Sequence, residues 1–159
     1  GEILTGGENL FSGYWPDGAD GPGEDGWWAT GDVGYLDADG DLFLVDRLKV
    51  LVIVSGFNVY PSEVEEVILE LDDVAQAAVI GVEDEMTGEA VVAYVTRAGE
   101  VDPEALVERV RAHCAARLAG FKQPSVVNVV DSLPSTITGK VQKGRLRATE
   151  RRRALGLLE

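Results

Sequence analysis

The chain has 159 residues, of which 45% are hydrophobic and 26% are charged. This composition is typical of a globular protein, and the length fits one domain, or one small domain with part of another. With 28 acidic and 14 basic residues, the formal net charge is −14. Such a charge disfavours nucleic acid as a primary partner, because phosphate binding needs an excess of Lys and Arg. No apolar run approaches the roughly 18 residues of a membrane-spanning helix, so we expect no transmembrane segment.

The cysteine content and the N-terminus bear on the origin of the chain. Cys114 is the only cysteine, so an intrachain disulfide is impossible and a reducing, cytoplasmic location is expected. Its place on an apolar helical face favours a core position over a nucleophilic role. The first residues, GEILTGGENLF, contain no initiator Met, basic segment or cleavage site. We therefore expect the chain to be a piece cut from a longer protein.

Residues 1–46 predict short strands separated by turns. GEILTG is a strand candidate, and PDGADGPGEDG is a polar loop. DVGYLD and DLFLVD flank the turn DADG and predict a β-hairpin. The aspartates of this turn superficially resemble a calcium loop, but its glycine comes one place early and Leu48 replaces the final glutamate. We predict a turn and no metal site.

Residues 48–159 alternate strands and helices. The β-branched run LKVLVIV predicts a buried strand, and PSEVEEVILEL has the apolar spacing of an amphipathic helix. AQAAVIGV and AVVAYVT predict two strands joined by the turn EDEMTGE. Asp102 caps a helix that has Pro103 at its first position and ends near Leu118. SVVNVV, TITGK and QKGRLRATERRRAL then predict a strand, a loop and a terminal helix. The predicted fold class is α+β, with a small mixed β-sheet flanked by about three helices.

The segments WWATGD and DRLKVLVIVSGFNVYPSEVE carry two of the chemical signals. A carboxylate at Asp32, after Thr30 and Gly31, could accept hydrogen bonds from the two hydroxyls of a ribose; a solvated turn aspartate is the alternative. The second segment places charged residues before a predicted buried strand, which suits a hinge between domains. Gly56 in the turn SGFN would let the backbone approach a ligand. A simple linker followed by a hairpin is the alternative.

The third signal is Lys140 in the segment LPSTITGKVQKGRLR. A loop that presents one ammonium group can stabilise negative charge between a carboxylate and a phosphate, whereas most loop lysines are simply solvated. A P-loop is excluded, because no glycine lies five residues before Gly139 and Val141 occupies the Ser/Thr position. The chain end is basic, which indicates a solvated helix face or an anion-binding stripe; its cations are Lys140, Lys143, Arg145, Arg147, Arg151, Arg152 and Arg153.

Taken in order, these segments resemble the C-terminal part of the adenylate-forming superfamily of acyl-CoA synthetases, luciferases and peptide-synthetase adenylation domains. The resemblance covers nearly the whole chain. It rests on GYW, DGWxxTGD, DxDG, DRxK, SGFNVYPxEVE, AAVIGVxD, GE, FKxP, LPxxxTGK and xLR. The segment SGFNVYPSEVE is most similar to the corresponding segment of medium- and long-chain fatty acyl-CoA synthetases. The resemblance implies ATP-dependent formation of an acyl-adenylate and transfer of the acyl group to coenzyme A.

The same resemblance implies a division of the chain and a role for each candidate residue. Residues 1–46 would end a large N-terminal adenylation domain, residues 47–49 would form the hinge, and residues 50–159 would form a mobile C-terminal α+β domain. Lys140 would be catalytic in adenylation. The nucleotide-binding residues would be Asp32, Arg47, Lys49 and Tyr35, with Lys49 also at the hinge, and the loop for the thiol step would contain Gly56, Phe57 and Asn58.

The implied partners are the missing N-terminal domain, ATP, a fatty acid and coenzyme A, with the magnesium ligand outside this chain. The fragment alone is expected to be inactive. Two departures stand out: Val50 occupies a position that is commonly acidic in the family, and Lys143 one that is often Arg. Two alternatives remain open. The acceptor could be a carrier-protein phosphopantetheine, or the chain could be a non-catalytic module that has kept the fold.

Overall fold

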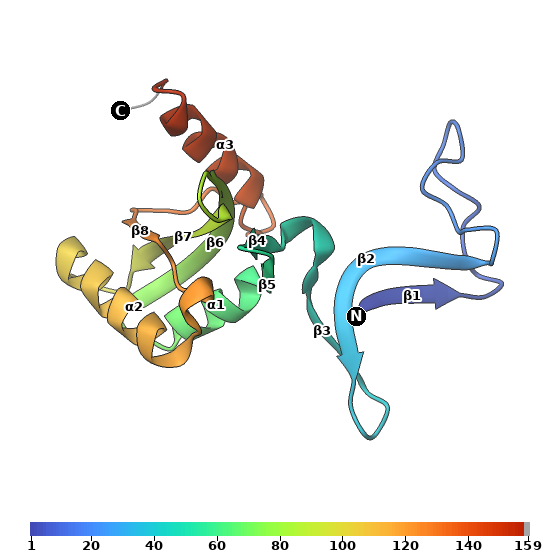
Figure 1. The fold of residues 1–159 in the computed structure, drawn as a ribbon, viewed down its shortest axis with the longest axis horizontal. Helices are drawn as coiled ribbons and strands as arrows, with labels where there is room; N and C mark the ends of the chain where they lie inside the picture. Colours follow the sequence, from blue (N-terminus) through green and yellow to red (C-terminus); the bar gives the residue numbers. More distant parts are fainter. Residues whose placement is uncertain (158–159) are drawn as a thin grey trace. The chain divides into compact units, whose positions relative to one another are not determined.

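The computed structural model describes residues 1–157 and divides into two compact units, Gly1–Lys49 and Val50–Glu159. The first unit is a three-stranded antiparallel sheet of β1 (Glu2–Gly6), β2 (Trp27–Leu36) and β3 (Leu42–Arg47), in the order β1-β2-β3 (Figure 1). The predicted hairpin is confirmed as β2 and β3. Asp37 Oδ1 closes its turn by accepting hydrogen bonds from the backbone N–H groups of Asp39 and Asp41, at 3.0 and 2.9 Å.

The second unit contains one mixed sheet and three α-helices, which confirms the predicted fold class. Its strands are β4 (Val52–Val54), β5 (Phe57–Val59), β6 (Val74–Asp84), β7 (Gly88–Arg97) and β8 (Val126–Val129). β8 runs parallel to β7, and the other pairs are antiparallel. The helices are α1 (Pro61–Leu69), α2 (Pro103–Arg117) and α3 (Lys143–Ala154), with 3₁₀ turns η1 (Leu48–Val50) and η2 (Gly120–Lys122).

The alternation of side chains along β6 and β7 gives the sheet two apolar faces. One face packs against α1 and α2 in a core that contains Val79, Val91 and Val95. The other face packs against α3 through Leu146 and includes Ile80. The helices therefore cover the sheet from both sides, as Figure 1 shows for α1 and α2 against α3. This three-layer arrangement leaves the loops at the sheet ends to carry the candidate site.

The prediction of one buried strand over LKVLVIV is wrong. Residues Leu48–Val50 form the 3₁₀ turn η1, and only Val52–Val54 are extended. Val52 and Val54 are buried, but Ile53 between them is 51% exposed. β4 is therefore a strand with one buried face, and the apolar residues before it belong to the connection between the two units. The segment that follows forms a hairpin, as in the alternative interpretation, and the predicted turn SGFN includes the first two residues of β5.

Two other details match their predictions. The predicted turn EDEMTGE is present but narrower, since β6 extends to Asp84 and β7 begins at Gly88. Cys114 is buried in the main core, and burial raises the pKa of its thiol to about 11, so the interpretation as a core residue is confirmed. Within residues 1–157, no helix has both the length and the apolar character needed to cross a membrane.

The N-terminus of α2 provides a stability prediction. Asp102 is the N-cap residue, and its Oδ2 accepts a hydrogen bond from the backbone N–H of Ala105 at 2.9 Å. We expect Asp102→Ala to lower the free energy of unfolding by about 1 kcal/mol, because that N–H loses its partner. Urea denaturation measures the change. Asp102→Asn retains an acceptor and is the control; equal losses for both variants would contradict the capping role.

Candidate functional site

The first candidate group pairs Asp32 with Arg47 across β2 and β3. The two residues lie directly opposite each other in the ladder, and Arg47 Nε is 2.8 Å from Asp32 Oδ1. Upstream, Gly31 has a φ of +73°, and Thr30 Oγ1 accepts a hydrogen bond from the Asp32 N–H at 3.1 Å. Thr30 Oγ1 in turn donates to the carbonyl of Ile3 at 2.9 Å. The carboxylate is thus fixed in direction, with its second oxygen making no further hydrogen bond within the described residues.

Tyr35 is not brought together with this pair. It lies three residues after Asp32 on the same strand, so the alternation of a strand directs its side chain to the opposite face. There its ring stacks on Phe43 with centroids 5.3 Å apart and an interplanar angle of 11°. The structure therefore groups Asp32 with Arg47 and places Tyr35 elsewhere.

Lys49 lies in η1 and is the last residue of the first unit. Its side chain is exposed, and Val50 begins the second unit. The boundary between the units therefore coincides with the end of the segment 47–49 that the sequence indicated as a hinge.

The second candidate group is the hairpin formed by β4 and β5. Ser55 has a φ of +51° and Gly56 a φ of +83°, and positive values at both central residues are typical of a type I′ turn. Phe57 and Asn58 follow on β5 and are exposed. The backbone N–H of Ser55 donates to the carbonyl of Thr87 at 2.7 Å, which ties the hairpin to the turn between β6 and β7. The predicted thiol-step residues thus form one protruding tip.

The third candidate group is the loop that carries Lys140. Two hydrogen bonds between Thr136 and Lys140 close this loop. The Thr136 N–H donates to the Lys140 carbonyl at 2.8 Å, and Thr136 Oγ1 accepts from the Lys140 N–H at 3.1 Å. Gly139 has a φ of +82° and donates to the Thr136 carbonyl at 2.9 Å. Lys140 is exposed, and within the described part of the chain it has no carboxylate at ion-pair distance. A self-supporting turn therefore presents a free ammonium group.

The base of this loop is fixed to the body of the second unit. Ser135 and Val141 form an antiparallel bridge, and the Gln142 N–H donates to the Pro134 carbonyl at 2.7 Å. Lys143 Nζ then lies 2.7 Å from Glu65 Oε1 on α1. Lys143, at the position that is often Arg in the family, therefore anchors the start of α3.

With these three groups described, the chain can be compared with known proteins. The AMP-binding enzyme C-terminal domain family matches residues 63–140. Residues 63–140 belong to this family. A long-chain-fatty-acid–CoA ligase of Yersinia pestis is 43% identical over 152 residues, which are 94% of this chain and 26% of that protein. A 3-[(3aS,4S,7aS)-7a-methyl-1,5-dioxo-octahydro-1H-inden-4-yl]propanoyl:CoA ligase of Rhodococcus jostii strain RHA1 is 50% identical over 151 residues, 92% of this chain and 29% of that protein.

The solved structures agree with the sequence relatives. The ATP-bound MatB from Rhodopseudomonas palustris superposes with a TM-score of 0.85 and 40% sequence identity, covering 95% of this chain and 30% of that one. The chain thus spans less than a third of the length of the proteins it matches. The matched family segment ends at Lys140, whereas Asp32 and Arg47 precede it.

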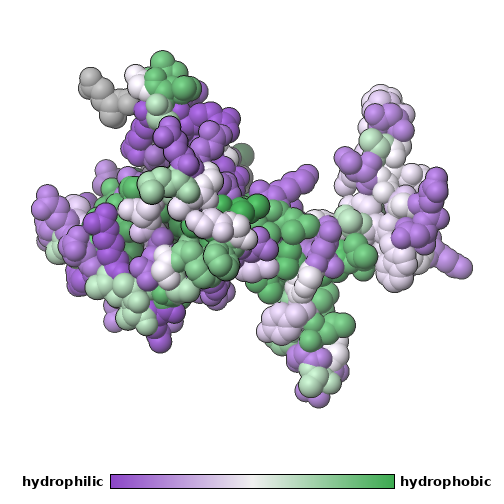
Figure 2. Space-filling view, in the orientation of Figure 1, coloured by the Kyte–Doolittle hydropathy of each residue, from purple (hydrophilic) through white to green (hydrophobic). Residues whose placement is uncertain are grey.

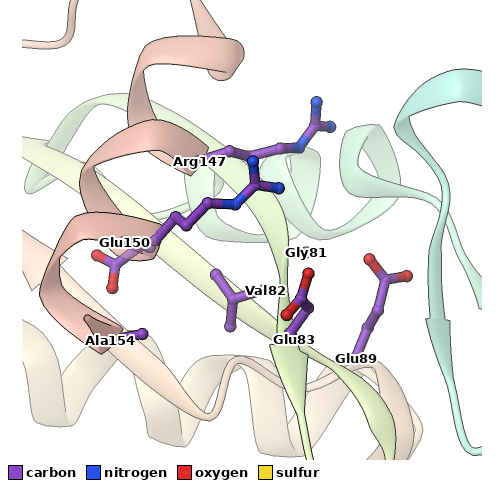
Figure 3. A pocket seen from close by; sticks show the side chains of 8 residues that line it. Gly81, Val82, Glu83, Glu89, Arg147, Glu150 and Ala154 are labelled. Atoms are coloured by element: carbon purple, nitrogen blue, oxygen red, sulfur yellow. The ribbon is translucent and has the colours of Figure 1, made fainter.

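The AMP-binding C-terminal domain also has a pocket between the sheet and α3 (Figure 3), with a volume of about 350 Å³. Its lining residues are Gly81, Val82, Glu83, Glu89, Arg147, Glu150, Arg151 and Ala154. Glu89 Oε2 accepts a hydrogen bond from the Ile53 N–H at 2.7 Å, and Glu150 pairs with Arg153 at 2.7 Å. Two of the carboxylates therefore support the fold. None of the residues predicted for catalysis, nucleotide binding, the hinge or the thiol step lines this pocket, whereas Arg147 and Arg151 of the basic chain end do.

The basic residues of α3 are divided between structural and exposed positions. Lys143, paired with Glu65, and Arg147, which lines the pocket, are half-buried. Arg145, Arg151, Arg152 and Arg153 are exposed, and Arg153 also pairs with Glu150. Figure 2 shows mainly hydrophilic surface over most of this helix. This pattern fits the solvated helix face better than a continuous anion-binding stripe.

No role was predicted for Phe121 and Lys122 of the FKQP motif, or for Glu63. In the AMP-binding C-terminal domain the ring of Phe121 stacks on Phe57, with centroids 4.7 Å apart. Lys122 Nζ contacts both carboxylate oxygens of Glu63, at 2.6 and 2.7 Å. The presence of FKxP among the family motifs was the one available signal. Nothing in the residue order connects that motif with the turn SGFN.

Proposed function

We propose that this chain is the C-terminal part of an AMP-forming acyl-CoA ligase. In this proposal the Lys140 loop serves adenylation of the carboxylic acid, and the Ser55–Asn58 hairpin serves the later transfer to coenzyme A. The observation that carries the proposal is the presentation of Lys140, which projects from a closed loop without a counter-ion among residues 1–157. The CoA-ligase relatives and the family match support it.

In the first half-reaction, a carboxylate oxygen of the acid attacks the α-phosphorus of ATP, and pyrophosphate leaves. Two anionic groups, the carboxylate and the α-phosphate, are then forced together, and negative charge lies on their non-bridging oxygens. A fixed ammonium group stabilises that charge most when it is already in place and does not have to be reoriented. The hydrogen bonds from Thr136 and Gly139 give the Lys140 backbone such a fixed geometry.

Asp32 and Arg47 suit the nucleotide. One oxygen of Asp32 is held by Arg47, and the other can accept a ribose hydroxyl. The guanidinium of Arg47 keeps its other nitrogens available to a phosphate or ribose oxygen. Tyr35, which stacks on Phe43 on the opposite face, has no comparable geometry, so we assign the nucleotide to the Asp32–Arg47 pair.

In the second half-reaction, the thiol of coenzyme A attacks the acyl carbon and AMP leaves. The proposed participant is the hairpin tip of Gly56, Phe57 and Asn58, because its exposed backbone and small central residue allow close approach of an extended chain. Lys140 and the hairpin tip lie on separate loops of one compact unit. A rotation about residues 47–49 would present them in turn, and Val50, in place of the usual acid, would begin the moving part.

Magnesium is not assigned a step in this chain. Within residues 1–157, no group of three or more His, Cys, Asp or Glu side chains is arranged to hold a metal ion. We place the magnesium ligand implied by the resemblance in the remaining part of the enzyme, along with the pocket for the acid.

For the acid itself we propose a medium- or long-chain fatty acid. The segment SGFNVYPSEVE and the Yersinia pestis relative support a fatty acid. The Rhodococcus jostii relative, in contrast, is named for a ring-bearing propanoate. The test is pyrophosphate release by the full-length enzyme with fatty acids of graded length, in parallel with ring-bearing propanoates. A preference for ring-bearing propanoates would contradict the fatty-acid assignment but not the ligase assignment. No pyrophosphate release with any acid would contradict the ligase assignment. Replacing coenzyme A with a phosphopantetheinylated carrier protein tests the other acceptor.

The Asp32–Arg47 pair gives a prediction for nucleotide binding. We expect Asp32→Ala in the full-length enzyme to raise the KM for ATP about tenfold or more, because a charge-assisted hydrogen bond to the ribose is lost. Initial rates at varied ATP measure this effect. Asp37→Ala, which removes a turn carboxylate of the same sheet, is the matched control. An unchanged KM for ATP in Asp32→Ala would contradict the assignment.

A further inference from the structure

The tip of the β4–β5 hairpin contacts a partly buried aromatic ring that packs against the core. Phe57 is 56% exposed, and its ring lies 4.7 Å from that of Phe121, with an interplanar angle of 23°. Phe121 lies in η2 and packs against the main hydrophobic core of the second unit. A stacked pair of this kind restricts the direction of both rings. The contact therefore links a protruding turn to the rigid body of the domain.

The hairpin is held to the domain by several contacts, including the buried side chains of Val52, Val54 and Val59. β4 and β5 have three residues each, and a two-stranded hairpin this short is only marginally stable alone. β4 is held by the Ile53 N–H bond to Glu89 and by the Ser55 N–H bond to Thr87. β5 is the edge strand of the sheet order β5-β4-β7-β6, and among the described residues it pairs only with β4. Val59 holds the end of β5 in the core, and the stack of Phe57 on Phe121 supports its exposed start.

The residue after Phe121, Lys122, forms an ion pair with α1. Lys122 Nζ contacts both oxygens of Glu63, in the first turn of α1, and lies 6.0 Å from the centre of the Phe121 ring. The Lys122 N–H also donates to the Ala119 carbonyl at 2.9 Å. Since α1 begins two residues after β5 ends, the ion pair joins η2 to the segment that follows the hairpin. A continuous series of contacts therefore runs from Phe57 to Phe121, and from the adjacent Lys122 to Glu63.

We propose that Phe121 is a positioning residue for the thiol step, and that the Lys122–Glu63 pair holds Phe121 in place. By stacking on Phe57, Phe121 fixes the direction in which the hairpin tip meets the pantetheine arm of coenzyme A. This inference rests on the proposed function. It adds that the rate of thioester formation depends on a contact outside the hairpin. Adenylation, which uses the Lys140 loop, does not depend on this contact.

The test compares the two half-reactions in the full-length enzyme. Phe121→Leu keeps apolar volume in the core but removes the stacking face. We expect thioester formation to slow about tenfold, with a raised KM for coenzyme A, while pyrophosphate release stays within about twofold. Phe121→Tyr should restore most of the rate, because it restores the stacking ring.

A second variant tests the ion pair. Lys122→Met should slow thioester formation about threefold, and in combination with Phe121→Leu it should add little, because both act on the same contact. Asp73→Asn, which removes the Asp73–Arg109 ion pair elsewhere in the domain, is the matched control and should leave both steps unchanged.

The outcomes separate this inference from the proposed function. If the unaltered enzyme performs both half-reactions, but Phe121→Leu slows both equally or slows neither, the positioning role is wrong and the ligase assignment stands. Failure of Phe121→Tyr to restore the rate also contradicts the role. If the unaltered enzyme releases no pyrophosphate with any acid, the proposed function is wrong and this inference falls with it.

Discussion

Replacing Lys140 with alanine is expected to slow acyl-adenylate formation by about 10²- to 10³-fold, the range found when one preorganised charge-stabilising donor is removed from a transition state. The physical reason is that the ammonium group has no carboxylate partner within residues 1–157 and is held on a loop closed by Thr136 and Gly139. Its removal therefore leaves the fold intact and removes only charge stabilisation. Pyrophosphate release by the full-length enzyme measures the effect.

The matched control for Lys140 is Arg152→Ala, which removes an exposed cation from α3. The control should retain nearly the full rate, because long-range effects between exposed charges are screened by salt. Lys140→Arg should recover part of the rate, since it keeps the charge with a different shape. If Lys140→Ala and Arg152→Ala behave alike, the catalytic assignment of Lys140 is wrong.

Gly56→Val is expected to slow thioester formation by about 10- to 100-fold while leaving adenylation nearly unchanged. Gly56 has a φ of +83°, and a Cβ added there would meet no atom within 4 Å. The cost therefore comes from the backbone, because a β-branched residue at positive φ is strongly disfavoured. The turn must change shape, and the Phe57 and Asn58 side chains move with it. A displacement of about 1 Å near reacting groups can cost about 10²-fold in rate.

Gly99 provides a matched control for this prediction. It has a φ of +88°, and again no atom lies within 4 Å of an added Cβ, but it belongs to the turn between β7 and α2. Gly99→Val therefore imposes a similar backbone strain away from both candidate loops. We expect it to lower stability without separating the two half-reactions. Equal damage to adenylation and thioester formation in Gly56→Val would refute the assignment of two loops to two steps.

The parts of the fold that were predictable are those with strong local signals. Asp102 and Pro103 mark the start of α2, and the apolar spacing after Pro61 marks α1. The region around β4 was less predictable, because an apolar run such as LKVLVIV can be a buried strand or a connection. Its true division depends on contacts with distant residues, such as the bond between Ile53 and Glu89. Local pattern cannot supply such long-range pairing.

The candidate site shows the same limit. Asp32, Arg47 and Lys140 were indicated by motif, and the ladder then brings Asp32 opposite Arg47. Strand alternation, however, places Tyr35 on the opposite face of β2. The motif alone does not show on which face each side chain lies. Phe121 and Glu63 were missed as supports of the hairpin, because their partners Phe57 and Lys122 are distant in sequence and are brought close only by the packing of η2 and α1.

In the proposed function, one small domain serves two chemical steps with two separate loops. The most direct measurement supplies the full-length enzyme with preformed acyl-adenylate and coenzyme A, so that only the second half-reaction is observed. Lys140→Ala should then form thioester at close to the unaltered rate, although its pyrophosphate release is lowered at least about 10²-fold, and Gly56→Val should show the reverse pattern. Loss of thioester formation from preformed acyl-adenylate in Lys140→Ala would contradict the assignment of two loops to two steps.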